Sequence, residues 1–249
     1  MEKKILIYLI FLLLFILIIL SYNKIDSFVI KTFDDTNSGI VTRVIDGDTI
    51  VDQNGQSYRL LGINTPEKGE KGYIEAKNFL ESLILNKTVS LKSQGEEYDL
   101  YNRRLAYVYL NNENINLKMI NEGYASAYFP TEMKKEEFYS AWEKCLEEGK
   151  NLCEKSQDIC KNCILLKEIN INTQIITLEN QCNFKCNLSF WTIKDEGRKK
   201  YVFGKFYLEN KKSVNISAKD FKQDYVWTKT GDSVFVKDAV NKLVIYYKY

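Results

Sequence analysis

Residues 39–63 read GIVTRVIDGDTIVDQNGQSYRLLGI, and this stretch carries the clearest signals of the fold. Its first half predicts a strand, a turn at Asp46-Gly47-Asp48 and a second strand. An Asn54-Gly55 pair then separates TIVDQ from QSYRLLGI, and this dipeptide is typical of the tight turn of a β-hairpin. We therefore expect three consecutive strands, with the segments on either side of the Asn54-Gly55 pair hydrogen-bonded to each other.

The sequence that follows adds helices and two more strands. Apolar residues recur at helical spacing over 73–85, and shorter and longer helices are expected at 117–123 and 134–153. Segments 88–92 and 104–110 predict strands, and the second of these, RLAYVYL, alternates with a period of two. Five short strands interrupted by a helix favour a small closed barrel of the OB type, so the fold class is mainly β with α.

From about Cys163 the sequence changes character. Strand-like runs recur, turn signals fall between them at Asp195-Glu196-Gly197 and Gly231-Asp232, and no helix is evident. The pattern predicts a separate β-sandwich of about 85 residues, within the usual range of domain sizes.

The N-terminus predicts a membrane segment. Lys3 and Lys4 precede an unbroken apolar run over residues 5–20, which nearly suffices to cross a bilayer core of ~30 Å. The run ends without the small residues of a cleavage site, which favours an uncleaved signal anchor over a cleaved signal peptide. The lysines would stay inside, so we expect the rest of the chain outside the cytoplasm, or secreted if the segment is cleaved.

Two features of the composition limit the chemistry and the binding that this chain can perform. The chain of 249 residues has no histidine, which excludes a Ser-His-Asp triad, a Cys-His pair and a His-ligated zinc site. Its net charge is only +2, so any binding of nucleic acid must come from local placement of Arg and Lys.

The six cysteines leave two alternatives. An even count in an exported chain indicates disulfides, whose pairing the sequence does not give. The spacing of Cys160-x-x-Cys163 and Cys182-x-x-x-Cys186 also fits a four-thiolate zinc site. The expected export favours disulfides.

Three blocks gather residues suited to one reaction. They are VIDGDT at 44–49, RLLGINTPE at 59–67 and DLYNRRLAY at 99–107. Asp48 and Asn64 offer hard oxygen ligands for Ca²⁺, and Glu67 is a nearby carboxylate that can activate water. Arg59 and Arg103 are fork-shaped cations that can hold a phosphate. A metal, a base and two guanidinium groups are what attack of water on a phosphodiester requires.

In order and spacing, the three blocks resemble the staphylococcal nuclease (thermonuclease) family. The resemblance covers about residues 39–150. It implies a calcium-dependent endonuclease that cuts DNA and RNA with low sequence specificity and leaves 3′-phosphate ends. The alternative is a non-catalytic nucleic-acid or protein-binding OB module displayed at the cell surface. No obligate protein partner is evident.

The resemblance also assigns roles. Asp48 matches a calcium-binding aspartate, Thr65 a threonine that offers its backbone carbonyl to the ion, and Glu67 the proposed general base. Arg59 and Arg103 match the two phosphate-binding arginines. Asp46 matches an aspartate that supports the metal site from behind the ligands, and Tyr128 is a candidate for stacking on a base.

One position departs from the family's pattern. Asn64 stands where the best-known member has a second aspartate ligand, so one negative charge is missing. We expect weaker calcium binding, nearer the ~10⁻⁴ to 10⁻³ M range of extracellular modules.

The last part of the chain resembles a lamin-tail domain, an immunoglobulin-like sandwich. The resemblance rests on NLSFWTI at 187–193, YVF at 201–203 and GDSVFVKD at 231–238. The predicted organisation is an anchor at 1–22, a linker at 23–38, a staphylococcal-nuclease-like domain at 39–155 and a lamin-tail-like domain at 160–249.

Overall fold

The computed structural model describes residues 36–93 and 97–249. The predicted anchor at 1–22 and most of the predicted linker lie outside the described residues. Among those that are described, no helix is long and apolar enough to cross a membrane.

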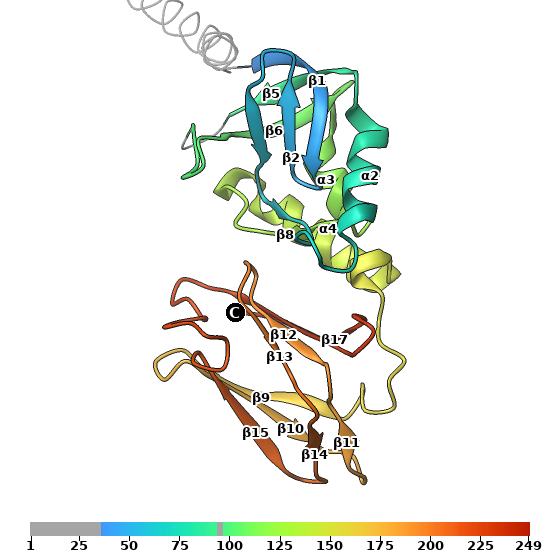
Figure 1. The fold of residues 1–249 in the computed structure, drawn as a ribbon, viewed down its shortest axis with the longest axis vertical. Coiled ribbons are helices and arrows are strands. Elements are labelled where there is room, and N and C mark those ends of the chain that lie inside the picture. The colour runs from blue at the N-terminus through green and yellow to red at the C-terminus, as the bar shows by residue number, and fades with distance from the viewer. Residues whose placement is uncertain (1–35, 94–96) are drawn as a thin grey trace, which may run out of the picture.

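The first half of the chain forms a closed five-stranded barrel (Figure 1). The strands are β1 (Thr36–Asp46), β2 (Thr49–Asp52), β3 (Ser57–Leu60), β5 (Thr88–Lys92) and β6 (Arg104–Leu110). They follow the order β3-β2-β1-β5-β6, and a parallel pairing of β3 with β6 closes the circle. β1 pairs with β5 through its first half and with β2 through its second half. It bends between them, because its register shifts after Val41 and Val44. The prediction of a mainly β fold with a barrel of OB type is confirmed.

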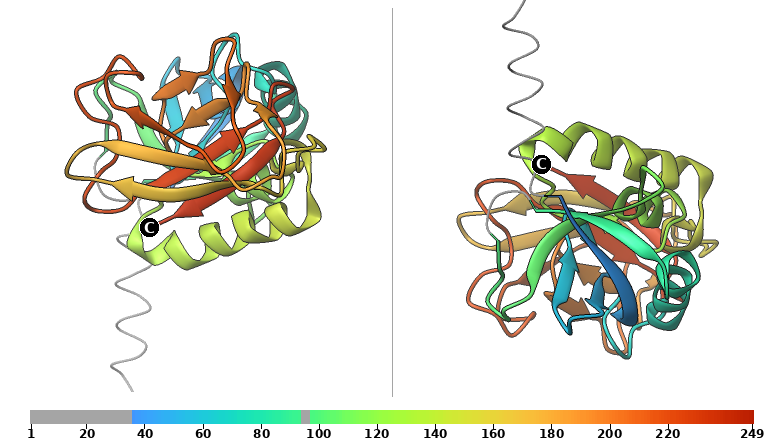
Figure 2. Two further views of the ribbon diagram at one scale, coloured as in Figure 1. Left: turned by 90° about the horizontal axis from the view of Figure 1, so that it is seen from below. Right: turned by 90° about the horizontal axis from the view of Figure 1, so that it is seen from above.

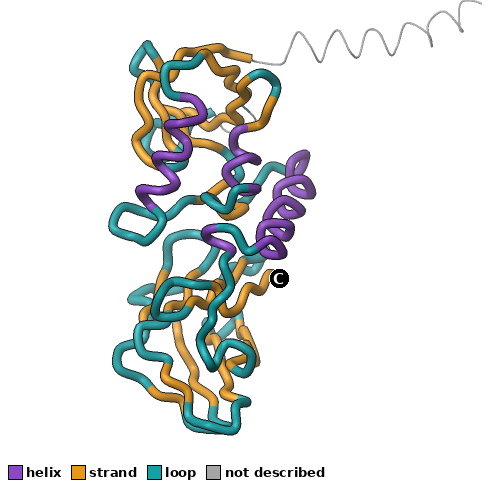
Figure 3. Tube along the Cα trace, turned by 90° about the vertical axis from the view of Figure 1, so that its right-hand side faces the viewer, coloured by secondary structure: helices purple, strands orange, loops and turns teal. Residues whose placement is uncertain are grey.

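Within the described residues, three α-helices accompany the barrel. They are α2 (Tyr73–Ile84), α3 (Ile115–Asn121) and α4 (Lys135–Glu148), and Figure 3 shows them all beside the barrel strands. The expected helix at 134–153 ends early, because Gly149 adopts a left-handed backbone (φ 67°) that caps α4. Short strands β4 (Ile63–Asn64), β7 (Glu113–Asn114) and β8 (Ser126–Ala127) and two 3₁₀ turns (Glu132–Lys134 and Asn151–Cys153) complete this part, which we call the barrel unit (residues 36–153).

Residues 160–249, the C-terminal unit, consist of strands in three sheets around a second core. One sheet holds β9 (Ile164–Asn170), β10 (Ile175–Asn180) and β15 (Ser213–Ser217), and a ribbon holds β11 (Cys186–Asn187) and β14 (Tyr207–Leu208). The third sheet holds β12 (Thr192–Lys194), β13 (Lys200–Val202), β16 (Ser233–Lys237) and β17 (Leu243–Lys248). Trp191 is buried in this core. The lamin-tail resemblance, the immunoglobulin-like topology and the domain boundaries stay predictions.

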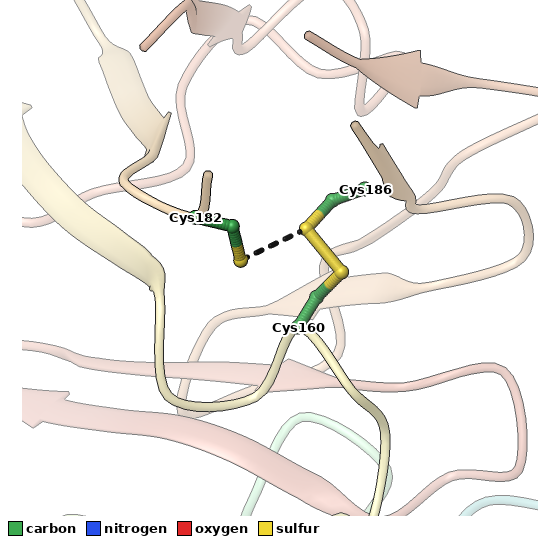
Figure 4. Close-up of side chains that lie close together, drawn as sticks. All are labelled: Cys160, Cys182 and Cys186. Carbon is green, nitrogen blue, oxygen red and sulfur yellow. Dashed lines mark hydrogen bonds between the residues drawn. A yellow bond between two sulfur atoms is a disulfide. The ribbon is translucent and has the colours of Figure 1, made fainter. Parts of the chain in front are cut away.

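All six cysteines are paired as disulfides. The bonds join Cys145 to Cys153, Cys160 to Cys186 and Cys163 to Cys182. The last two lie together, with the sulfurs of Cys182 and Cys186 only 3.3 Å apart (Figure 4). They tie the segment before β9 to the loop after β10 and to the first residue of β11, so the start of the C-terminal unit is cross-linked to its own core.

The two units share apolar core. Helix α4 lies beside β17 (Figure 2), and Phe235 and Leu243 of the C-terminal unit belong to the core cluster of the barrel. The Phe235 ring lies 5.9 Å from the Trp142 ring in an edge-to-face contact, and 5.2 Å from the Tyr246 ring. Such packing is typical of a single core rather than of a loose contact between domains.

Ion pairs add to this contact. The carboxylate of Glu70, on the loop before α2, lies 2.7 Å from the Lys200 ammonium and 3.6 Å from that of Lys194. Burial raises the pKa of Glu70. The two lysines and the hydrogen bond from the Glu67 N–H outweigh this effect and lower the pKa to about 2.

We predict that the two units unfold in one transition. In the Phe235→Ala variant the shared core loses a ring that is only 7% exposed, and we expect the free energy of unfolding to fall by about 3 kcal/mol. Thermal unfolding followed by tryptophan fluorescence and by circular dichroism measures this. Val240→Ala, at a residue that is 61% exposed, is the control and should change little. Two separate transitions in the unmodified protein would contradict the shared core.

A second prediction concerns pH. The folded-state pKa of Glu70 lies below its ordinary value of 4.5, so its contribution to stability is present above that pH and is lost as the pH falls toward 2. Glu70→Gln should cost about 1–3 kcal/mol at pH 7, and the difference from the unmodified protein should shrink below pH 4.5. Urea titrations at several pH values test this, with Glu147→Gln on an exposed face of α4 as the control. A cost that does not change with pH would show that the charge of Glu70 is not what matters.

Candidate active site

The Asp46-Gly47-Asp48 turn joins β1 to β2 and forms the floor of the site. A side chain at Gly47 would meet the Ala76 and Thr65 side chains at 2.8 and 2.9 Å, so only glycine lets the turn pack this closely on α2. The Asp48 carboxylate is buried, and its Oδ2 accepts hydrogen bonds from the backbone N–H (3.3 Å) and the hydroxyl (2.9 Å) of Thr65. Asp48 and Thr65, which the sequence assigns to one metal site, are therefore in direct contact.

Arg59 projects from β3 onto the same carboxylate. Its Nη2 lies 3.1 Å from Oδ2 of Asp48 and donates a hydrogen bond to the Ile63 carbonyl at 2.8 Å. Its Nη1 donates to the Leu60 carbonyl at 2.7 Å. The guanidinium is thus fixed by backbone acceptors as well as by the ion pair.

Arg103 approaches from the opposite side of the turn. It follows Asn102, whose φ of 60° turns the chain sharply before β6. Its Nε donates to the Asp99 carboxylate at 2.8 Å, and its Nη1 donates to the Thr49 hydroxyl at 3.0 Å. That hydroxyl in turn donates to Oδ1 of Asp48 at 3.1 Å. One hydroxyl therefore links Arg103 to Asp48, which places both arginines around a single carboxylate.

The pKa values of two carboxylates near these arginines, Asp99 and Asp46, are shifted from their ordinary values. Burial raises the pKa of Asp99, but hydrogen bonds from Arg103 and Tyr101 and the Arg103 charge lower it below its ordinary value. Asp99 thus stays ionised and orients Arg103. Burial, and then the charge of Asp48, raise the pKa of Asp46 to about 6, while its Oδ1 accepts the Asp48 N–H at 3.1 Å. Two carboxylates close together in a buried turn favour a cation between or beside them.

Asn64 ends β4 and Glu67 lies on the loop that follows, and both contact the C-terminal unit. The side-chain amide nitrogen of Asn64 donates to the carbonyls of Glu196 (3.2 Å) and Gly197 (3.1 Å). The Glu67 carboxylate pairs with Nε of Arg198 at 2.7 Å. The metal-binding role of Asn64 and the water-activating role of Glu67 stay predictions. Sequence reasoning missed these partners, because they lie more than 130 residues away along the chain.

Tyr128 lies half-buried beside the cluster. Its backbone N–H donates to the Gly62 carbonyl at 2.8 Å, and its ring packs edge-on against the Phe129 ring at 4.9 Å. Burial raises the pKa of its hydroxyl, which the nearby charge of Arg59 opposes. The stacking role of Tyr128 stays a prediction.

A cavity of about 230 Å³ opens next to Asn64 and Thr65, between the two units. Its lining combines residues of the barrel unit, such as Glu70 and Ser126, with Lys194, Lys200 and Lys237 of the C-terminal unit. Burial lowers the pKa of Lys237 to about 8, and the charge of Lys194 adds to this effect. The site is thus bordered on this side by residues of both units.

Two of the residues that sequence reasoning missed, Thr49 and Asp99, could have been found from the sequence. Both belong to the quoted blocks, and Asp99 stands four residues before Arg103, a spacing that allowed the observed ion pair. No local signal pointed to Glu196 or Arg198.

Comparison with known proteins agrees with the geometry. A family model for staphylococcal nuclease homologues matches residues 57–155. Over 101 residues the chain is 42% identical to a thermonuclease of Staphylococcus intermedius, covering 37% of this chain and 60% of that protein. A thermonuclease of Staphylococcus hyicus is 42% identical over 98 residues, covering 36% of this chain and 58% of that protein.

A third relative extends further. An uncharacterized protein of Methanocaldococcus jannaschii is 35% identical over 153 residues, covering 47% of this chain and 71% of that protein. The chain spans about 60% of the length of the two thermonucleases. The barrel, the three blocks and these relatives lead to one conclusion, that the chain belongs to the family of staphylococcal nuclease homologues.

Proposed function

We propose that the protein is a calcium-dependent endonuclease that hydrolyses phosphodiester bonds of DNA and RNA with low sequence specificity. One observation carries this proposal: Arg59 and Thr65 both contact the buried Asp48 carboxylate, and one hydroxyl links Arg103 to it. Glu67 follows two residues after Thr65 in the chain. The thermonuclease relatives support a nuclease of this class. A barrel that served only for binding would have no need to bury Arg59 and hold a second, partly buried arginine around one aspartate.

The oxygen donors of the site suit calcium. The Asp48 carboxylate, the side-chain oxygen of Asn64 and the backbone carbonyl of Thr65 are hard ligands, and Asp46 adds negative charge behind them. Nitrogen and sulfur ligands of the kind that zinc prefers are absent from these three positions. A bound calcium ion would offset the charge that develops on the phosphate during attack by water.

The chain's own residues supply the remaining steps. The guanidinium groups of Arg59 and Arg103 hold the non-bridging phosphate oxygens and gain strength as negative charge builds on them. Glu67 orients a water molecule and accepts its proton as the water oxygen bonds to phosphorus. The bond from phosphorus to the 5′-oxygen then breaks, and the 5′-oxygen takes up a proton from solvent water and leaves as a hydroxyl. The phosphate stays on the 3′ side, as the family resemblance implies.

We propose, further, that residues 5–20 hold the protein in a membrane with the barrel outside the cytoplasm. The unbroken apolar run after Lys3 and Lys4 supports this, and so does the pairing of all six cysteines, which an oxidising compartment permits. The C-terminal unit is proposed to be a lamin-tail-like accessory module. Fractionation of cells, with protease added from outside, tests the location: a barrel that resists protease in intact cells would contradict it.

The test of the enzymatic proposal is cleavage by the purified protein. Single-stranded DNA and RNA should both be cut in millimolar Ca²⁺ and left intact in excess chelator, because the arginines alone do not supply enough positive charge. Gel analysis of the products measures this, and the ends should carry 3′-phosphates. Folded protein that cuts neither substrate at any calcium concentration would leave the alternative, a non-catalytic binding module.

Glu67→Gln should lower kcat by about 10²- to 10⁴-fold, the usual contribution of a general base. The substitution keeps the size of the side chain and removes its charge, so calcium binding and folding should be preserved. Glu75→Gln on an exposed face of α2 makes the same charge change and is the control. A Glu67→Gln variant with full activity would exclude this carboxylate as the base.

A further inference from the structure

We propose that the turn at residues 195–199 of the C-terminal unit is a component of the active site and that Arg198 is a positioning residue for the Glu67 carboxylate. This inference rests on the proposed nuclease function and deepens it. It assigns a part of the reaction to a unit in which sequence reasoning found no catalytic residues.

The first observation is the ion pair itself. Nε of Arg198 lies 2.7 Å from Oε1 of Glu67. Within residues 36–93 and 97–249, Arg198 is the one cation paired with this carboxylate. Both side chains are partly exposed, 55% for Arg198 and 42% for Glu67, and an ion pair on an open surface contributes little by itself. This ion pair can hold the Glu67 carboxylate in one orientation only if the backbone around Arg198 is fixed.

The turn is fixed by its own hydrogen bonds. It connects β12 to β13, and Asp195 closes it because its N–H donates to the Lys199 carbonyl (3.0 Å) and its Oδ1 accepts the Lys199 N–H (2.8 Å). The Glu196 N–H donates to the Asp232 carboxylate at 3.1 Å, which ties the turn to the start of β16. Arg198 therefore projects from a closed turn whose two ends are strands of one sheet.

The turn is also bound to the barrel unit. The Glu196 side chain is buried, and its Oε1 accepts hydrogen bonds from the Phe129 N–H (3.0 Å) and the Tyr139 hydroxyl (3.2 Å). Its Oε2 accepts the Ser233 hydroxyl at 3.0 Å. A buried carboxylate with three donors from two units resists displacement, because moving it would leave those donors unpaired.

Asn64 completes the attachment and explains the departure from the family's pattern. Its amide donates to the Glu196 and Gly197 carbonyls from a side chain in a residue that is 6% exposed. An aspartate at this position has no N–H to donate and would set a carboxylate against two carbonyl oxygens. Compared with an aspartate, Asn64 therefore lacks one negative charge near the proposed metal site but forms a fixed contact with the turn that carries Arg198.

These contacts give Arg198 a defined task. With Oε1 of Glu67 held by the guanidinium, the carboxylate keeps one orientation, and its other oxygen remains for the water molecule. Glu67 sits in a loop, where orientation is otherwise lost to side-chain rotation. Arg198 thus acts through Glu67 and not on the phosphate.

The test uses the full chain with Arg198→Ala, Arg198→Lys, Glu67→Gln and the double variant Arg198→Ala with Glu67→Gln. We expect Arg198→Ala to lower kcat about 10-fold with less than about a twofold change in KM, since a misplaced base slows the chemical step. Arg198→Lys should recover part of the rate. In the Glu67→Gln background, Arg198→Ala should cause no further loss. Arg43→Ala, at an exposed position of β1, removes the same charge and is the control.

The outcomes separate the possibilities. A faster Arg198→Ala variant would show that the arginine blocks the site, and a rise in KM that persists without Glu67 would show that it binds substrate. Either result, or an unchanged kcat, would overturn the positioning role alone. Cleavage by none of the proteins, the unmodified chain included, would overturn the proposed function itself.

The docking of the turn has a test that does not depend on activity. Asn64→Asp should speed hydrogen exchange at the backbone amides of residues 196–199 and of Phe129, because it removes the two hydrogen bonds that Asn64 donates to the turn. Asn64→Ser, with a hydroxyl that can still donate, should disturb exchange less. Equal protection in the Asn64→Asp variant and the unmodified protein would show that Asn64 does not hold the turn.

Discussion

The site depends on the parallel pairing of β3 with β6, which closes the barrel. In this register Tyr58 lies opposite Arg104 and Arg59 opposite Leu105. The pairing therefore brings Arg59 and Arg103 to the same end of the barrel, although they belong to separate blocks of the sequence. The antiparallel neighbour β2 places Thr49 opposite Arg59, which sets the Asp48 turn between the two arginines.

Burying charges in this way is costly, and the surrounding hydrogen bonds offset the cost. Taking a carboxylate and a guanidinium out of water loses several kcal/mol per ion unless the remaining donors and acceptors are satisfied. Asp48 has partners on both oxygens, and Arg59 donates to two carbonyls besides the ion pair. The charges of the cluster are thus held in place by hydrogen bonds before any ligand arrives, and fixed charges of this kind can accelerate a reaction.

The C-terminal unit is joined to this barrel by a shared core and by hydrogen bonds. Phe235 packs on Trp142 within one core, and the Glu196 carboxylate takes donors from both units. A unit held this firmly can present a side chain at the site with the precision of a barrel residue. The Glu67–Arg198 contact follows from that rigidity, since an exposed ion pair between two mobile domains would not persist.

The sequence by itself determined the barrel and most of the site. Alternation in RLAYVYL, the Asn54-Gly55 turn and the glycine-containing Asp46–Asp48 turn are local signals, and local signals fix strands, turns and the residues at their ends. It also named Asp48, Arg59, Thr65, Glu67 and Arg103, because they occur in ordered blocks. Only the tertiary structure decided the disulfide pairing, the shared core and the partners of Asn64 and Glu67. These contacts join segments far apart in the chain, and residue types at distant positions carry no record of which of them will meet.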